Sequence, residues 1–469
     1  MEGIINEHEG TGNKRKHPKG LFLLFITEMW ERYSYYGMRS ILVLYLTAEL
    51  ISGGLGMDKS SALMLYGLYT GLVYFTPLIG GYLTDRLMGL RTAITIGGIT
   101  MAFGDFTLFL VQEKWGLYLG LLLLIIGNGF FKPNISTLVG ELYEKNDPRK
   151  DSAFTIFYMG INLGGLISPI IAGLIYATWF HSTTGGVETF GFKYAFLASS
   201  IGMIIGQVLF NSLSKKYLGD IGVQPAATKA TPSNSNGSAA PLTKHEKHRT
   251  IVILILACFT VMFWAGFEQA GASFTLYTRD FIDRTVFGYE VPVSFFQSLN
   301  PFFILLLAPV VSILWLKLSR TKRGDFSIPT KMSFGLILLG LGFMVMVPAV
   351  MITGSDESAT VQVTMMFMIV TYLFHTLGEL CLSPIGLSLV SKMAPIKIAS
   401  LLMGVWFLSN AAANYLAGYI ASLTTHIGYL EIFTYLGIAA IVLGIILLAL
   451  SKSLQKLMHL DDFETTTKV

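Results

Sequence analysis

Long apolar runs dominate this sequence and set the strongest limit on its fold. A helix needs about 20 apolar residues to cross the hydrocarbon core of a bilayer, and twelve stretches of the chain have that length. Only 13% of the residues are charged, about half the share typical of a soluble protein. We therefore predict an all-α integral membrane protein with twelve transmembrane helices. The predicted spans are residues 21–50, 60–84, 92–111, 115–140, 152–180, 192–214, 250–278, 293–318, 330–352, 360–392, 398–424 and 429–452.

A polar stretch between the sixth and seventh spans divides the chain into two halves. Residues 219–249 are rich in Ala, Thr, Pro, Ser and Asn, a composition typical of a flexible linker. The halves would be six-helix bundles over residues 21–218 and 250–454, with cytoplasmic tails at 1–20 and 455–469. Two linked six-helix halves are the plan of the major facilitator superfamily, in which the substrate site lies at mid-membrane between the halves.

Lysines and arginines are distributed unevenly between the two predicted faces of the membrane. Cytoplasmic loops carry an excess of these residues, and most of them fall in the tails, in the central linker and in loops on the same side. We predict a multi-pass protein of the cell inner (plasma) membrane with both termini in the cytoplasm. The opposite face would carry Lys59, Lys114, Lys193, Arg279 and Arg284.

Charge and cysteine content argue against several other classes of protein. The formal net charge is +4 and the basic residues form no single patch, so binding of nucleic acid is not expected. Cys258 and Cys381 lie in apolar runs without the spacing of a metal site or a disulfide framework. We find no catalytic constellation of nucleophile, base or metal, and no loop long enough for a soluble recognition domain. An enzyme, a receptor and a metalloprotein are therefore not expected.

Eight charged side chains fall inside the predicted spans. An ionised side chain at the bilayer centre costs about 2.5–3.5 kcal/mol on insertion scales unless it faces a polar cavity. We therefore expect these residues to mark a transport pathway, except for Asp105, which has no evident partner and receives no functional role. The eight residues are Glu28, Glu31, Arg32, Arg39, Asp105, Lys132, Glu268 and Glu379.

The first span concentrates its polar residues on one face. Their spacings of three, four and seven stack them along one side of a helix. Two interpretations are open: an internal ion-pair lock that only joins helices, or a proton site beside a ligand-binding cation. We favour the second, because two neighbouring carboxylates do not both ionise cheaply and the adjacent Arg32 couples their proton affinity to its other contacts. The residues of this face are Glu28, Glu31, Arg32, Tyr35, Tyr36 and Arg39.

Other spans contribute further charges. Pro133 follows Lys132 in the fourth span and disrupts a backbone hydrogen bond, which leaves backbone polarity that should face a cavity. Glu268 and Glu379 supply carboxylates from the second half, whereas the first half supplies the cations Arg39 and Lys132. This arrangement suits a ligand that carries both charges.

Four uncharged residues of the spans each allow two roles. Asn162 and Asn300 could bind a substrate backbone or bond to another helix, and position alone favours the second role. Trp264 and Trp406 could form the apolar walls of a pocket or pack in the core, and both alternatives stay open.

Six motifs resemble those of the proton-dependent oligopeptide transporters, also called the peptide transporter family. Their order along the chain matches, and the resemblance covers nearly the whole sequence. It implies a major facilitator fold and proton-coupled uptake of di- and tripeptides. Many bacterial members insert two further helices between the halves, for which the polar linker leaves no room. The motifs are EMWER at 28–32 (family ExxER), GGYLTDR at 80–86, KPN at 132–134, FYMGINLGG at 157–165, FWAGFEQ at 263–269 and GEL at 378–380.

The resemblance also implies how a peptide would be held. Arg39 and Lys132 would receive the substrate carboxylate, and Glu379 would receive the ammonium group with help from Asn300. A site that holds both termini accepts many side chains. Further residues expected at this site are Tyr35, Tyr36, Tyr74, Asn162, Trp264, Glu268 and Trp406.

Two salt bridges are expected to alternate as gates. Family precedent pairs Arg39 with Glu268 near the extracellular side and Lys132 with Glu379 near the cytoplasmic side. Breaking one pair while forming the other would expose the site to alternate sides of the membrane.

The proton would be the coupling ion, with no other cofactor. It would act through Glu28, Glu31 and Arg32, because protonation of the carboxylates would release the arginine. Alternative cargoes on the same fold are nitrate or another small solute. A drug exporter fits less well, since it would use a largely apolar cavity. The expected partners are di- and tripeptides, peptide-like drugs and the lipid bilayer, and the protein is expected to be a monomer.

Overall fold

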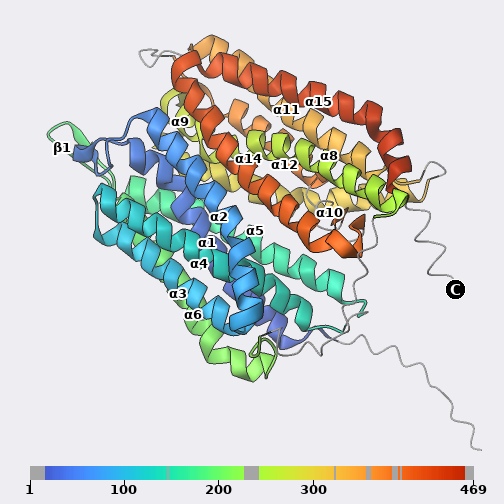
Figure 1. Ribbon diagram of the computed structural model, residues 1–469. Helices are drawn as coiled ribbons and strands as arrows, with labels where there is room; N and C mark the ends of the chain where they lie inside the picture. The colour runs from blue at the N-terminus through green and yellow to red at the C-terminus, as the bar shows by residue number, and fades with distance from the viewer. Residues whose placement is uncertain are drawn as a thin grey trace, which may run out of the picture.

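Two helical bundles lie side by side in the protein (Figure 1). The computed structural model describes residues 16–144, 147–225, 242–321, 324–354, 361–382, 389–390 and 393–459. Each bundle buries its own apolar core. Most of the predicted tails and parts of the predicted tenth span and linker lie outside the described residues, whereas α1 begins at Lys19 and α15 ends at Met458, within the predicted tails.

The first bundle is formed by six long helices. Two short elements, η1 and the β1–β2 hairpin, lie at the end of the bundle where α1 and α5 finish. The elements are α1 (Lys19–Thr47), η1 (Leu50–Ser52), α2 (Lys59–Leu87), α3 (Leu90–Leu110), α4 (Lys114–Glu141), α5 (Lys150–Leu174), η2 (Ile175–Trp179), β1 (Ser182–Thr184), β2 (Val187–Thr189) and α6 (Phe192–Leu218).

The second bundle repeats this plan, with one helix interrupted. Short strands connect its helices, with β3 parallel to β6 and β4 antiparallel to β5. The elements are α8 (Lys244–Phe267), η3 (Glu268–Gly271), α9 (Ser273–Phe281), β3 (Ile282–Asp283), β4 (Thr285–Val286), β5 (Tyr289–Glu290), η4 (Val293–Ser298), α10 (Leu299–Ser319), α11 (Ile328–Thr353), β6 (Val363–Thr364), α12 (Met366–Leu382), η5 (Ile396–Ile398), α14 (Ala399–Ile427) and α15 (Tyr429–Met458).

Nine helical segments of the described chain are long and apolar enough to cross a membrane. Three further helices complete the twelve predicted spans, and each is less apolar or shorter for a visible reason. α1 carries the charged face with Glu28, Glu31, Arg32 and Arg39, α12 is described over 17 residues, and α14 is rich in Ser, Thr and Asn.

The seventh span is broken, whereas the sequence predicted one continuous helix over residues 250–278. α8 ends at Phe267, a 3-10 turn follows, and Ala272 leaves the helical region before α9 starts. A Cβ at Gly271 would lie 1.8 Å from the hydroxyl of Tyr66 and 3.1 Å from Nη2 of Arg39. The break and the glycine therefore allow polar groups of the first bundle to approach this turn closely.

The predicted linker begins where α6 ends at Leu218, but its predicted end at residue 249 is wrong. α8 already begins at Lys244, because Thr243 and Glu246 form a reciprocal capping box there. At the other end the chain packs back on the first bundle, where the amide of Arg91 donates to the carbonyl of Gly222 at 3.0 Å. Residues 226–241 lie outside the described residues, so the predicted flexibility of that stretch stays a prediction.

Helices α2 and α14 join the two bundles through small residues. A Cβ at Gly67 would lie 2.6 Å from the Cα of Gly418, and one at Gly71 would lie 3.1 Å from the carbonyl oxygen of Ala411. Such backbone approach is typical of helix interfaces in membranes. The interface lies in the half of α2 that is near its start, which is the predicted extracellular half.

Candidate functional site

A polar cavity of about 260 Å³ lies between the two bundles. It brings together all but three of the residues predicted to bind substrate or carry protons. Side chains of opposite charge come from both bundles, as expected for a site in a transporter of this fold. The predicted residues that line it are Glu28, Arg32, Tyr36, Arg39, Tyr74, Lys132, Asn162, Trp264, Glu268, Asn300 and Glu379.

Arg32 is enclosed by the two acids of its own helix. Its Nε lies 3.3 Å from Oε1 of Glu28, and its Nη2 donates to Oε1 of Glu31 at 2.5 Å. All three side chains are almost fully buried. Asn128 of α4 adds a weaker contact, with Nδ2 3.4 Å from Oε1 of Glu31. The predicted cluster is therefore present, with Glu31 behind Arg32 and outside the cavity lining.

Arg39 connects the first bundle to the second. Its Nη2 forms a hydrogen-bonded ion pair with Oε2 of Glu268, which is the first residue of the broken segment. Its Nε donates to the hydroxyl of Tyr66 on α2 at 2.6 Å. The pairing of Arg39 with Glu268 is thus observed, and its action as a gate stays a prediction. Tyr66 was not among the predicted site residues, since an uncharged tyrosine in an apolar span gives no distinctive signal.

Lys132 makes a different contact from the predicted one. Its Nζ lies 4.0 Å from the centroid of the Tyr74 ring, a cation–π distance. Among the described residues it forms no ion pair, with Glu379 or any other acid. The predicted pair between Lys132 and Glu379 is therefore not formed among the described residues, and its action as a gate stays a prediction.

Glu379 is held from the second bundle by an amide. Nδ2 of Asn300 donates to Oε2 of Glu379 at 2.7 Å and lies 3.1 Å from Oγ1 of Thr376. Hydrogen bonds to an ionised group are worth about 1.5–3 kcal/mol, so Asn300 orients the carboxylate in the cavity. Asn162, the other predicted asparagine, donates to the carbonyl of Tyr158 in its own helix at 3.0 Å and lines the same cavity.

Two predicted binding residues do not line the cavity. Trp406 of α14 is buried in the apolar core of the second bundle, so the packing role is correct for it. Tyr35 is also buried, with its ring under the guanidinium of Arg32 at 5.1 Å and edge-on to Tyr36. Helical periodicity placed Tyr35 on the polar face of α1 but did not show which part of this face lines the cavity. Part of the face packs against α2 instead.

Asp105 has a partner that the sequence did not reveal. Ser34 of α1 donates from Oγ to Oδ2 of Asp105 at 2.5 Å, and Asp105 is fully buried between helices. Asp105 therefore has a hydrogen-bonded partner in a neighbouring helix, although none was evident in the sequence. The contact joins α1 to α3 behind the acidic cluster.

The bundles close against each other on one side of the cavity. Oγ of Ser294 donates to the carbonyl of Pro169 at 2.8 Å, and Oγ of Ser298 donates to that of Leu166 at 2.8 Å. Farther out, Nζ of Lys59 lies 2.9 Å from Oδ2 of Asp280. These contacts lie on the predicted extracellular side.

The sequence model of the POT family matches residues 91–225 and 227–436 of the chain. The uncharacterized transporter YclF of Bacillus subtilis (strain 168) is 37% identical over 487 residues, which span 94% of this chain and 95% of that protein. This chain belongs to the POT family. A second relative of this chain is the di-/tripeptide transporter of Lactococcus lactis subsp. lactis (strain IL1403). It is 31% identical over 94% of this chain and 96% of its own length.

Solved structures agree with the POT family assignment. The crystal structure of peptide transporter POT in complex with sulfate superposes with a TM-score of 0.84 at 34% identity, covering 94% of this chain and 96% of that chain. The predicted major facilitator fold, with twelve helices in two six-helix bundles, is thereby confirmed. This chain is an integral membrane protein, and the solved structures that share its architecture are transporters.

Several residues that line the polar cavity were not predicted from the sequence. Gln297 binds across the bundles, with Nε2 3.3 Å from the carbonyl of Ser40 and 3.1 Å from Oγ1 of Thr275. Tyr158 lies within the recognised FYMGINLGG motif, so that motif could have indicated it. The other missed lining residues are Ser136, Ile161, Gly165, Phe267, Ala270, Pro301, Ile304, Tyr372 and His375.

Proposed function

We propose that this POT family member is a peptide transporter that takes up di- and tripeptides together with protons. The observation that carries the proposal is the opposition of charges across one cavity, with Lys132 on the first bundle and Glu379 on the second. A zwitterionic peptide has a carboxylate and an ammonium group a limited distance apart. The names of the relatives, which include a di-/tripeptide transporter, support the same cargo.

The peptide carboxylate is held first by Lys132 in this conformation. Arg39 is already engaged by Glu268, whereas Lys132 forms no ion pair with a described residue and lies over the ring of Tyr74. The ammonium group binds Glu379, which Asn300 keeps oriented. Small shifts within the cavity then allow Arg39 to share the carboxylate once its own pair opens.

The peptide backbone is left to uncharged groups. Tyr36, Tyr74 and Asn162 line the cavity near the carboxylate end and offer hydroxyl and amide groups. Trp264 and Phe267 contribute apolar wall. Because the charges bind the termini, the walls need only exclude water and tolerate different side chains.

Proton coupling depends on the cluster of Glu28, Glu31 and Arg32. Protonation of Glu31 removes one of the two charges that hold Arg32 in place. The guanidinium of Arg32, which lines the cavity, is then held less tightly and its position can depend on whether a peptide is bound. A membrane potential contributes about 2.3 kcal/mol per charge per 100 mV, enough to drive appreciable accumulation of peptide.

Alternating access follows from the two ion pairs. The pair between Arg39 and Glu268 is formed and that between Lys132 and Glu379 is open, which corresponds to a site closed from outside and accessible from the cytoplasm. Binding of peptide and proton in the opposite state would favour the reverse arrangement. The proposal places the monomeric protein in the cell inner membrane with both termini in the cytoplasm, and requires no cofactor other than the proton.

Uptake of labelled dialanine into proteoliposomes tests the proposal. An imposed inward proton gradient is expected to drive accumulation, and the E31Q variant is expected to exchange dialanine without accumulating it. The matched control is E431Q, which changes an exposed glutamate at the start of α15. Accumulation that persists intact in E31Q would contradict the coupling role. If nitrate inhibits the uptake of labelled dialanine and unlabelled dialanine does not, the proposed peptide cargo is wrong.

A further inference from the structure

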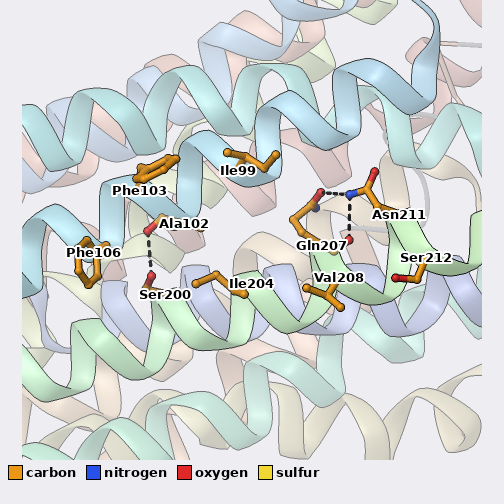
Figure 2. Close-up of a pocket in the computed structure, with 10 residues that line it drawn as sticks. All are labelled: Ile99, Ala102, Phe103, Phe106, Ser200, Ile204, Gln207, Val208, Asn211 and Ser212. Carbon is orange, nitrogen blue, oxygen red and sulfur yellow. Dashed lines mark hydrogen bonds between the residues drawn. The ribbon is translucent and has the colours of Figure 1, made fainter.

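A second cavity lies on the outer surface of the first bundle, away from the polar cavity between the bundles. It has a volume of about 590 Å³ and runs between α3 and α6. Both helices lie on the side of their bundle that faces away from the second bundle (Figure 1). Figure 2 shows the residues that line it: Ile99, Ala102, Phe103, Phe106, Ser200, Ile204, Gln207, Val208, Asn211 and Ser212.

The groove changes from apolar to polar along its length. Phe103, Phe106 and Ile204 line one end and are substantially exposed to the surroundings of the protein. Gln207 and Asn211 line the other end, where Asn211 donates to the carbonyl of Gln207 at 2.9 Å. From Ser200 to Ser212 the groove follows α6 for about 18 Å at 1.5 Å per residue. That length reaches from the membrane interface to the middle of a bilayer.

A buried amide lies at the polar end of the groove. Nε2 of Gln207 has no hydrogen-bond partner among the described residues, although the side chain is only 5% exposed. The amide is held against α3 at Gly98, where a Cβ would lie 2.0 Å from Nε2. Buried donors are almost always paired, and Gln207 lines the groove, so this amide is a candidate donor to an acceptor of a ligand in the groove.

Basic residues continue the groove beyond its polar end. Lys215 and Lys216 follow Asn211 and Ser212 by four positions, so they project from the same side of α6. Both are exposed, and within the described chain neither forms an ion pair. Arg91 of α3 adds a third cation beside them, with Nη2 2.6 Å from Oγ of Ser214.

We propose that this groove binds one anionic phospholipid of the cytoplasmic leaflet. An acyl chain lies along Ile99, Phe103 and Ile204, an ester carbonyl accepts from the amide of Gln207, and the headgroup phosphate lies near Lys215 and Lys216. The order of apolar, amide and cationic residues along the groove matches the order of these parts in such a lipid. Anionic lipids attract basic residues at this surface, and the site is independent of the cargo.

Photocrosslinking of the unmodified full chain tests the proposal directly. The protein is reconstituted with phosphatidylglycerol or phosphatidylcholine carrying a photoactivatable acyl chain, and labelled peptides are identified by mass spectrometry. Labelling by the phosphatidylglycerol probe is expected to concentrate on residues 99–106 and 200–212. Labelling spread evenly over all membrane-facing helices, or equal labelling by both lipids, would overturn the proposal.

Two pairs of variants locate the binding determinants. V208W fills the groove and is expected to reduce labelling there at least fivefold, whereas V442W places the same side chain on α15 and leaves it unchanged. Exchange of Lys215 and Lys216 for Gln is expected to lower the preference for phosphatidylglycerol about fivefold per lysine. The matched control exchanges Lys452 and Lys456 on α15.

The size of the reconstituted protein distinguishes a protein occupant from a lipid. If V208W converts a dimer to a monomer while lipid labelling elsewhere is unaffected, the groove is a self-association surface and the lipid site is refuted. Equal labelling of V208W and V442W would likewise refute it.

Discussion

Arg39 of α1 and Glu268 of η3 form an ion pair that joins the two bundles, and both side chains are almost fully buried. The seventh span breaks at Glu268, and Gly271 leaves room for Tyr66 beside the pair. Removing one partner of such a pair typically costs about 3–5 kcal/mol, since the other charge stays buried. We therefore expect closure of the predicted extracellular side to depend on this contact.

Removal of the Glu268 charge is expected to open that side. In E268Q, Arg39 keeps a hydrogen-bond partner but loses its counter-charge, so the closed state loses stability relative to the open one. Spin labels at Leu50 and Phe287, exposed residues of the two bundles, should report a second, longer distance by pulsed electron resonance. E290Q, whose partner Arg284 lies in the same bundle, should keep the original distance. An unchanged distribution in E268Q would remove the gate from the mechanism.

Lys132 is expected to bind the peptide carboxylate. K132Q should weaken dialanine binding by about 10- to 100-fold, the loss of one charge-assisted hydrogen bond of about 1.5–3 kcal/mol. Alanyl-alaninamide, which lacks the carboxylate, should bind K132Q and the parent protein equally. Competition against labelled dialanine gives the affinities. The carboxylate role is wrong if K132Q weakens the amide as much as the acid.

Glu379 is expected to bind the ammonium group. E379Q should weaken dialanine binding about 10- to 100-fold by the same energy, whereas N-acetyl-dialanine, without the ammonium charge, should bind E379Q and the parent protein alike. N300A should have a smaller effect, because it removes only the orienting hydrogen bond. Full affinity of E379Q for dialanine would place the ammonium group elsewhere.

The contact between Gly67 and Gly418 is expected to limit closure of the two bundles. G67A adds a Cβ 2.6 Å from the Cα of Gly418, so α2 and α14 must separate, at a cost of about 1–3 kcal/mol. The initial rate of dialanine uptake should fall several-fold. G404A is the matched control, because a Cβ at Gly404 meets nothing within 4 Å. Equal rates for both variants would show that this contact does not limit transport.

Asp105 is expected to stabilise the first bundle without taking part in transport. D105L leaves the hydroxyl of Ser34 without its acceptor and should reduce stability by about 1–3 kcal/mol. D105N keeps an acceptor and should stay close to the parent protein in thermal unfolding and in dialanine uptake. Loss of proton-driven uptake in a stable D105N protein would assign the residue a role in coupling.

Helix number, the two halves and most of the cavity were predictable from the sequence. Transfer of a segment into lipid is close to a sum over its residues, so apolar runs reveal spans before any contact is known. A charge in such a run is costly wherever the chain folds, which is why Glu28, Arg39, Lys132 and Glu379 indicated the cavity. Within α1, helical spacing also placed Glu28, Arg32 and Arg39 on one face.

Tertiary structure decided which of these groups meet. Tyr66, Ser34 and Trp406 carry no signal in the sequence that distinguishes a partner of Arg39, a partner of Asp105 or a core residue. The break at Glu268 and the open state of the pair between Lys132 and Glu379 likewise depend on how the bundles approach each other. Hydropathy is a local property of the chain, whereas these contacts arise between helices far apart in sequence, where close packing of small residues determines the distances.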